Sequence, residues 1–367
     1  MTPGDLTRYD PDRDTLASLL DGEPAYRIGQ LWDGLYRQGR PLEDVTGLPG
    51  ALRERLAADL PTALTATAEQ RTDDGATTKW LWRLHDGAAV ETVLMHYPDR
   101  TTVCVSTQAG CAMACGFCAT GQAGFERHLT VGEIVEQVVR AQWAAGDRRV
   151  SNVVFMGMGE PLANFEATWG ALQRLHGDIG IGARHLTVST VGLVPGIRRL
   201  TESDLPVGLA VSLHAADDAL RDELVPINRR YPLAELVEAC DEYRRRTRRR
   251  LSIEWALIDG VNDRYEDADR LARIARGLAA HVNLIPLNPT PGYPVVGSSR
   301  NRVHAFRDRL AAAGVAVTIR DTRGRDIDAA CGQLRAGHAV TVAGPVRNAP
   351  RTGARTGDAD VPVGPDP

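Results

Sequence analysis

The sequence predicts an α/β fold in which parallel strands alternate with helices to form a barrel or an open partial barrel. From residue 101 onward, short apolar runs alternate with amphipathic segments, and this order repeats six times. Serial strand–helix units favour parallel strands joined by right-handed crossovers. A doubly wound open sheet is the competing architecture, but no G-x-G-x-x-G follows the first strand. We therefore expect residues 91–343 to form one partial (βα)6 barrel.

The predicted strands are short and regularly spaced. They cover residues 102–107, 152–156, 185–190, 206–214, 251–257 and 282–287, with a further short strand at 315–320. The clearest helix begins after Thr130, because Thr130 and Glu133 have the spacing of a capping box and an apolar face follows them. Pro232 opens another helix, which places Cys240 on its inward face as a buried residue.

The two ends of the chain differ from this pattern. Residues 1–90 look helical, with apolar residues at helical spacing around Leu16 and Leu31 and a helix from Ala51 that stops at Pro61. They are expected to form a small accessory domain, which is either a solubilising cap or a substrate-docking module. Residues 344–367 are rich in Pro, Gly, Asp and Arg without periodicity, and we expect a disordered tail.

The composition is that of an ordinary globular protein. Of 367 residues, 43% are hydrophobic and 25% are charged. The sequence has no run of eighteen apolar residues and no apolar stretch near Met1 of the kind found in signal peptides. A cytoplasmic protein without membrane contact is therefore expected. The net charge of −4 gives no global attraction to nucleic acid, so any RNA binding must come from local basic patches.

Four of the six cysteines lie between residues 104 and 118. In a reducing compartment, clustered cysteines are more often metal ligands or catalysts than disulfide partners. The pattern Cys111-x-x-x-Cys115-x-x-Cys118 can hold three corners of an iron–sulfur cube and leave the fourth iron open. The alternative is a zinc site completed by a histidine such as His96 or His128, but no second ligand knuckle is present.

This spacing, with Phe117 beside the last cysteine, resembles the signature of the radical S-adenosylmethionine (SAM) superfamily. The resemblance implies one [4Fe–4S] cluster held by Cys111, Cys115 and Cys118. It also implies that the amino and carboxylate groups of SAM chelate the open iron. An electron from the cluster then splits SAM into methionine and a 5′-deoxyadenosyl radical.

Further polar residues fall at predicted strand ends, where barrel enzymes bind their ligands. Gly159 and Glu160 lie in Gly157-Met158-Gly159-Glu160-Pro161, which resembles the GGEP-type element of the superfamily, and Glu160 is expected to hold the SAM ammonium. Four other expected SAM contacts lie at the ends of later strands, and a fifth follows the sixth strand: Ser189, Ser212, Leu213 and His214, and then Asn288. A serine at a strand end is usually a turn residue, so the shared position of these residues carries the inference.

Cys104 and Cys331 complete a resemblance to the RlmN/Cfr family of RNA methyltransferases, which extends over residues 91–337. The resemblance implies that one SAM methylates Cys331 and that a radical from a second SAM takes a hydrogen from this methyl group. The methylene radical adds to an electron-poor adenine carbon, and Glu91 accepts the ring proton. Cys104 then attacks the Cys331 sulfur, which releases RNA and leaves a Cys104–Cys331 disulfide for a thiol reductant.

The substrates that the resemblance implies are adenosine 2503 of 23S rRNA and, in some members, adenosine 37 of tRNA, methylated at carbon 2. A Cfr-like enzyme acting on carbon 8 remains the alternative. We expect a monomer that takes electrons from a reductant such as flavodoxin and docks RNA through residues 1–90. The arginine run 244–250 is either a helix-end cation cluster or a phosphate contact, and Arg320, Arg323 and Arg325 are better placed to guide RNA.

Two other classes stay open. A radical SAM activase would not need Cys104 and Cys331 as a pair, and a non-enzymatic iron–sulfur protein that binds RNA would release no 5′-deoxyadenosine.

Overall fold

A ten-stranded sheet forms the body of the molecule in the computed structural model, which describes residues 6–288 and 296–320. The strand order is β1-β2-β3-β4-β7-β8-β9-β10-β11-β12. From β4 onward every neighbouring pair is parallel. Within the described residues β12 does not pair back onto β4, so the barrel is open, as the sequence predicts.

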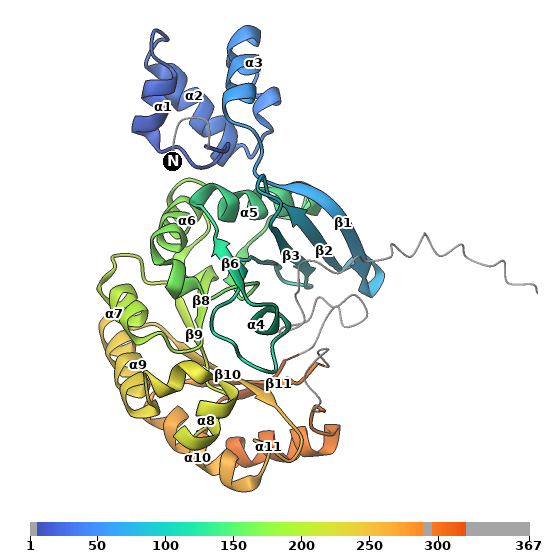
Figure 1. Cartoon of the computed structure of the whole chain (residues 1–367), viewed down its shortest axis with the longest axis vertical. Helices are drawn as coiled ribbons and strands as arrows, with labels where there is room; N and C mark the ends of the chain where they lie inside the picture. Colours follow the sequence, from blue (N-terminus) through green and yellow to red (C-terminus); the bar gives the residue numbers. More distant parts are fainter. Residues whose placement is uncertain (1–5, 289–295, 321–367) are drawn as a thin grey trace, which may run out of the picture.

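The parallel strands and their helices follow the predicted order. The strands are β4 (Thr101–Cys104), β7 (Asn152–Phe155), β8 (Leu186–Thr190), β9 (Gly208–Ser212), β10 (Leu251–Leu257), β11 (His281–Pro286) and β12 (Val317–Ile319). The helices are α5 (Val131–Ala145), α6 (Phe165–Gly177), α7 (Val194–Glu202), α8 (Asp218–Leu224), α9 (Leu233–Thr247), α10 (Tyr265–Gly277) and α11 (Arg300–Ala312). Helices α6, α7, α9, α10 and α11 run along the outer side of the sheet (Figure 1). No helix in the described part of the chain is long and apolar enough to cross a membrane.

The predicted local signals are confirmed. Helix α5 begins with the complete Thr130–Glu133 capping box, in which each side chain bonds the other residue's backbone amide. Helix α9 begins at Leu233 with Pro232 as its cap residue, and the Cys240 side chain is buried on its inner face. The predicted tail lies outside the described residues.

Three helices at the N-terminus stand apart from the barrel at one end of the molecule (Figure 1). They are α1 (Arg13–Leu19), α2 (Tyr26–Trp32), which continues as a π-helical turn, and α3 (Gly50–Asp59). Polar contacts fasten them to the barrel: the Asp10 carboxylate accepts from the Gly132 amide at 2.8 Å, and the Trp32 indole donates to Asp178 at 2.8 Å. Gly132 is required at this contact, because a Cβ there would lie 2.7 Å from Asp10.

The prediction that residues 1–90 are helical is wrong beyond residue 64. Residues 65–96 form three antiparallel strands, β1 (Thr65–Thr72), β2 (Thr77–Arg83) and β3 (Ala89–His96), which extend the barrel sheet at its β4 edge. The expected domain boundary at residue 90 therefore falls inside β3. Asp-Gly pairs at the hairpin turns, with Gly75 and Gly87 at positive φ, allow the tight reversals that join these strands.

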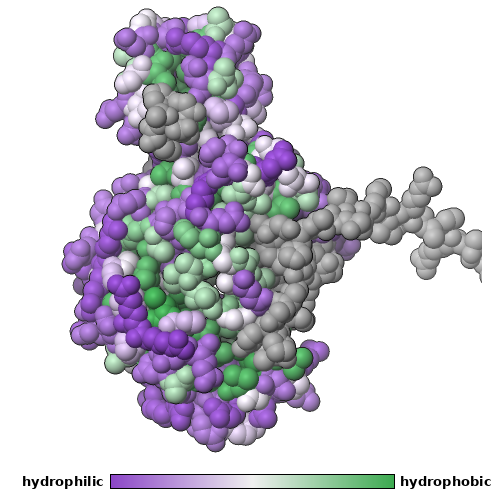
Figure 2. Space-filling view, in the orientation of Figure 1, coloured by the Kyte–Doolittle hydropathy of each residue, from purple (hydrophilic) through white to green (hydrophobic). Residues whose placement is uncertain are grey.

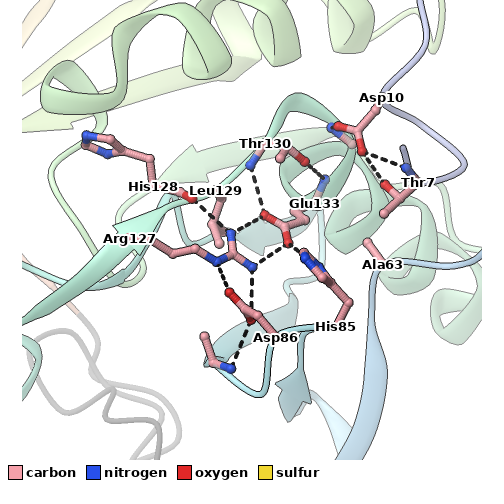
Figure 3. A network of polar contacts seen from close by, with 12 residues as sticks. Thr7, Asp10, Ala63, His85, Asp86, Arg127, His128, Leu129, Thr130 and Glu133 are labelled. Carbon is pink, nitrogen blue, oxygen red and sulfur yellow. Dashed lines mark hydrogen bonds and ion pairs between the residues drawn. The ribbon is translucent and has the colours of Figure 1, made fainter. Parts of the chain in front are cut away.

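A small second sheet carries the cysteine segment. Strands β5 (Gln108–Gly110) and β6 (Phe125–His128) pair and enclose the loop 111–124 with the short helix α4 (Ala119–Ala123). Arg127 on β6 pairs with Glu133 on α5 at 2.7 Å and with Asp86 in the β2–β3 turn (Figure 3). This ion-pair chain ties the base of the cysteine loop to the barrel.

Candidate active site

A pocket that is open to solvent lies at the carboxyl ends of the barrel strands. Nine of the predicted site residues line it: Cys111, Cys115, Cys118, Gly159, Glu160, Ser189, Ser212, His214 and Asn288. On the face that carries α4, apolar residues gather over the middle of the barrel between hydrophilic borders (Figure 2).

All three cysteines of the loop line this pocket. Cys115 is buried, and Cys111 and Cys118 are half-buried. The loop is closed by a 2.6 Å bond from the Cys111 amide to the Gly124 carbonyl, and a Cβ on Gly110 would collide with that carbonyl. Three soft thiol ligands on one short loop fit a [4Fe–4S] cluster.

Burial governs the chemistry of these thiols. It raises the pKa of Cys111 to about 12 and raises the pKa of Cys115 further. Both groups are therefore protonated in the metal-free protein at neutral pH, and cluster assembly must release their protons.

The zinc alternative does not fit the histidines. His96 Nδ1 lies 3.2 Å from the Thr101 hydroxyl, and His128 Nδ1 lies 3.0 Å from the Gln108 amide nitrogen. Neither histidine lines the pocket. Within the described residues, no group of three His, Cys, Asp or Glu side chains is arranged to hold a single metal ion.

Glu160 is a buried carboxylate held in a fixed orientation. One oxygen accepts from the Leu162 amide at 3.1 Å and the other from the Val191 amide at 2.9 Å, which joins the loops after β7 and β8. Burial raises the pKa of Glu160 to about 7 despite these bonds. A cationic ligand such as an ammonium would restore its charge, which is the role predicted from the sequence.

Gly159 allows this loop to pack closely. Its φ is +102°, and a Cβ there would lie 2.6 Å from the Gln108 side chain. Gln108 in turn accepts from the Glu160 amide at 2.8 Å. Gln108 thus supports the glutamate loop, and it could not be predicted from sequence because a single buried glutamine belongs to no motif.

His214 faces the pocket as a neutral ring. Its backbone is left-handed (φ +60°), its Nδ1 accepts from the Ala256 amide at 3.0 Å, and its ring packs edge-on against Phe117 at 4.7 Å. Burial lowers its pKa to about 3. Leu213, another predicted contact, is buried and does not line the pocket, and its amide and carbonyl are bonded to Glu254 and Arg221.

Two further charged residues in this region were not predicted. Arg221 on α8 is fully buried and donates to the carbonyls of Leu213 at 3.1 Å and Val191 at 2.6 Å. Glu254 on β10 lines the pocket, accepts from Asn283 at 2.7 Å and lies 3.6 Å from Arg320. Burial raises the pKa of Glu254. Neither belongs to a recognisable spacing, so only the fold brings them to the site.

Glu91 and Cys104 are not among the residues that line the pocket. Cys104 is in register with Val93 on β3 and with Val154 on β7, so Glu91, Cys104 and the pocket-lining Met156 share one face of the sheet. Cys331 lies outside the described residues, as do Arg323 and Arg325.

An open parallel barrel with a three-cysteine loop at its carboxyl end defines a radical SAM enzyme. The family model described as Radical SAM superfamily matches residues 105–272. The crystal structure of a radical SAM methyltransferase from Sphaerobacter thermophilus is 52% identical, with a TM-score of 0.88, and covers 90% of this chain and 100% of that one.

Curated relatives are similar over nearly the whole chain. A probable dual-specificity RNA methyltransferase RlmN from Salinispora tropica is 54% identical over 92% of this chain and 94% of its own length. One from Thermobifida fusca, with the same name, is 52% identical over 91% of this chain and 95% of its own length. The chain therefore belongs to the RlmN family of radical SAM methyltransferases.

Proposed function

We propose that this enzyme methylates carbon 2 of adenine in RNA, at adenosine 2503 of 23S rRNA and at adenosine 37 of tRNA. The relatives named dual-specificity RNA methyltransferases support an RNA substrate. The observation that carries the proposal is the placement of Glu91 and Cys104 on one sheet face that continues into the three-cysteine pocket.

The residues divide the chemistry among them. A [4Fe–4S] cluster held by Cys111, Cys115 and Cys118 would supply the electron that splits SAM. Glu160 would hold the SAM ammonium, and Ser189, Ser212, His214 and Asn288, which line the same pocket, would hold the rest of the cofactor. The glycine-bearing loop at Gly159 and the apolar residues of the pocket exclude water from the reacting groups.

Two thiols and one carboxylate carry out the steps on the RNA. Cys331 carries the methyl group to the ring, and Glu91 accepts the ring proton. The Cys104 thiolate then attacks the Cys331 sulfur, so that a sulfur–sulfur bond forms as the sulfur–carbon bond to the product breaks. The freed carbon takes up a proton to complete the methyl group, and the unpaired electron of the adduct would return to the cluster. A flavodoxin-type donor would provide electrons, and a thiol reductant would restore Cys104 and Cys331.

RNA docking is assigned to the N-terminal helices α1–α3 and to basic residues near the pocket. Arg320 supports the second assignment, because it follows β12 directly and lines the pocket. A target adenine must leave its stack to reach this position, which favours loop RNA over a regular helix.

Product analysis tests the proposal. The anaerobically reconstituted enzyme is incubated with SAM, a reductant and either a 23S rRNA fragment or tRNA, and the digested RNA is compared with 2-methyl- and 8-methyladenosine standards by mass spectrometry. We expect 2-methyladenosine, and none from Cys331→Ala. Formation of 8-methyladenosine would assign the Cfr-like reaction instead, and 5′-deoxyadenosine without methylated RNA would indicate an activase.

A further inference from the structure

Lys79 is the only lysine among the 43 basic residues of the chain, and it is buried. It lies on β2, in the antiparallel extension of the barrel sheet. All the remaining residues of this basic set are arginines, so a single buried lysine ammonium is unusual in this chain. The residues around Lys79 indicate why a lysine occupies this position.

Lys79 forms an ion pair with Glu91 on the neighbouring strand. Lys79 Nζ lies 3.6 Å from Glu91 Oε2, and the two side chains are 6% and 3% exposed. Lys79 is in register with Val93, which is in register with Cys104. Lys79, Glu91 and Cys104 therefore project from the same face of three adjacent strands.

The opposite face of β3 packs against helix α5. Thr92 points away from Glu91, and its hydroxyl donates to Gln137 on α5 at 2.8 Å. Trp82 donates to the same hydroxyl at 3.0 Å. This face packs the sheet against α5, so a substitution at Thr92 perturbs β3 without touching the Lys79–Glu91 pair.

A buried carboxylate needs a nearby cation to remain ionised, because desolvation disfavours its charge. An ammonium meets that need as a compact point charge with three rotatable donors, whereas a guanidinium is a broad planar fork. We propose that Lys79 is a positioning residue for Glu91. It holds the carboxylate ionised and directed along the face of Cys104, so that Glu91 can take the adenine proton.

This inference rests on the proposed function and concerns one step of it. The ring C–H bond of the protein–RNA adduct breaks, its electron pair stays in the adduct, and the proton forms an O–H bond at Glu91. Lys79 does not touch the adenine. Its removal should therefore slow proton transfer and leave the earlier steps unchanged.

The test measures decay of the covalent adduct in the reconstituted full-length enzyme. In Lys79→Met, we expect Cys331 methylation and 5′-deoxyadenosine release at wild-type levels, while the adduct seen on a denaturing gel decays about tenfold more slowly. Deuterium at carbon 2 should slow this decay further. Lys79→Arg should recover part of the rate, and the matched control Thr92→Val should decay as the wild type does.

A second measurement does not depend on turnover. Protein labelled with [15Nζ]lysine has one side-chain resonance, which should exchange slowly with water and shift in Glu91→Gln. Wild-type decay in Lys79→Met, or parallel loss of 5′-deoxyadenosine, would overturn the inference. If Cys104→Ala accumulates adduct but Lys79→Met does not, the inference alone fails; if neither does, the proposed function fails.

Discussion

The hydroxyl of Ser106 donates a 2.6 Å hydrogen bond to the backbone carbonyl of Glu91. The same hydroxyl accepts from the Met158 amide at 2.9 Å. Through this one side chain, the strand that carries Glu91 is tied to the loop that carries Glu160. The Glu91 strand and the Glu160 loop are therefore held in a fixed relation by a buried serine just beyond β4, which the roles proposed for the two carboxylates require.

Replacing Ser106 should loosen that relation. Ser106→Ala leaves a buried carbonyl and a buried amide without the hydroxyl, which costs about 1–3 kcal/mol of unfolding free energy. We also expect weaker SAM binding, because the Glu160 loop loses a support. Urea unfolding and calorimetric SAM titration measure the two effects. Ser151→Ala, at the opposite end of the barrel, should leave SAM affinity unchanged.

Arg221 belongs to no sequence motif, but we expect it to stabilise the fold and to support SAM binding. Its guanidinium joins the loops after β8 and β9 and also donates to Asn228 at 2.8 Å. Arg221→Met should lower the unfolding free energy by about 3 kcal/mol, because several buried acceptors lose their donor. SAM affinity should fall about tenfold, equal to about 1.4 kcal/mol.

Two variants sharpen this test. Arg221→Lys restores charge but not the planar fork, so it should recover little SAM affinity. Arg198→Met removes a half-exposed arginine that lies among glutamates on the outer surface, and it should bind SAM as the wild type does. Unchanged SAM affinity in Arg221→Met would contradict the proposed link between the loops.

Much of the barrel could be predicted from sequence because each parallel strand is a short apolar run bounded by helix signals. The strand at 251–257, for example, is predicted to the residue. The site residues at or just after strand ends, such as Ser212 and Asn288, could be placed because parallel strands bring their carboxyl ends to one edge.

The remainder depends on tertiary structure. Side-chain burial alternates only weakly along strand β1, so its sequence carries little hydrophobic pattern. Its pairing with β2 is set by the turn at Asp74 instead. Arg221 and Lys79 are single charged residues whose partners lie on other elements. Only sheet register and helix packing bring such partners together, and neither is visible in local spacing.

A separate prediction concerns the Arg127–Glu133 ion pair at the base of the cysteine loop. Arg127 bonds both oxygens of the buried Glu133, at 2.7 and 2.8 Å. Arg127→Met should destabilise the fold by about 3 kcal/mol, since Glu133 loses its main cation. The loosened β5–β6 hairpin should retain less iron and sulfide after reconstitution, as measured by elemental analysis. Arg100→Met, which breaks an exposed pair, should retain the wild-type amount, and equal retention in both variants would contradict the prediction.

His214 gives the protein a distinctive dependence on pH. Its pKa is about 3 in the folded protein because the ring is buried, against an ordinary 6.5. Below pH 6.5 the unfolded chain binds a proton that the folded chain does not, so stability falls as the pH falls. The loss is about 1.4 kcal/mol per pH unit between 6.5 and 3.

Asparagine at this position removes the titration while tolerating the left-handed backbone, and its side-chain oxygen can accept from the Ala256 amide in place of Nδ1. The unfolding free energy of the metal-free wild type, minus that of His214→Asn, should therefore decrease by about 2.7 kcal/mol as the pH falls from 7.5 to 4.5. Urea unfolding at four or five pH values measures this difference. A difference that stays constant over that range would show that the ring binds its proton equally in both states, and the neutral His214 assigned to the pocket would be wrong.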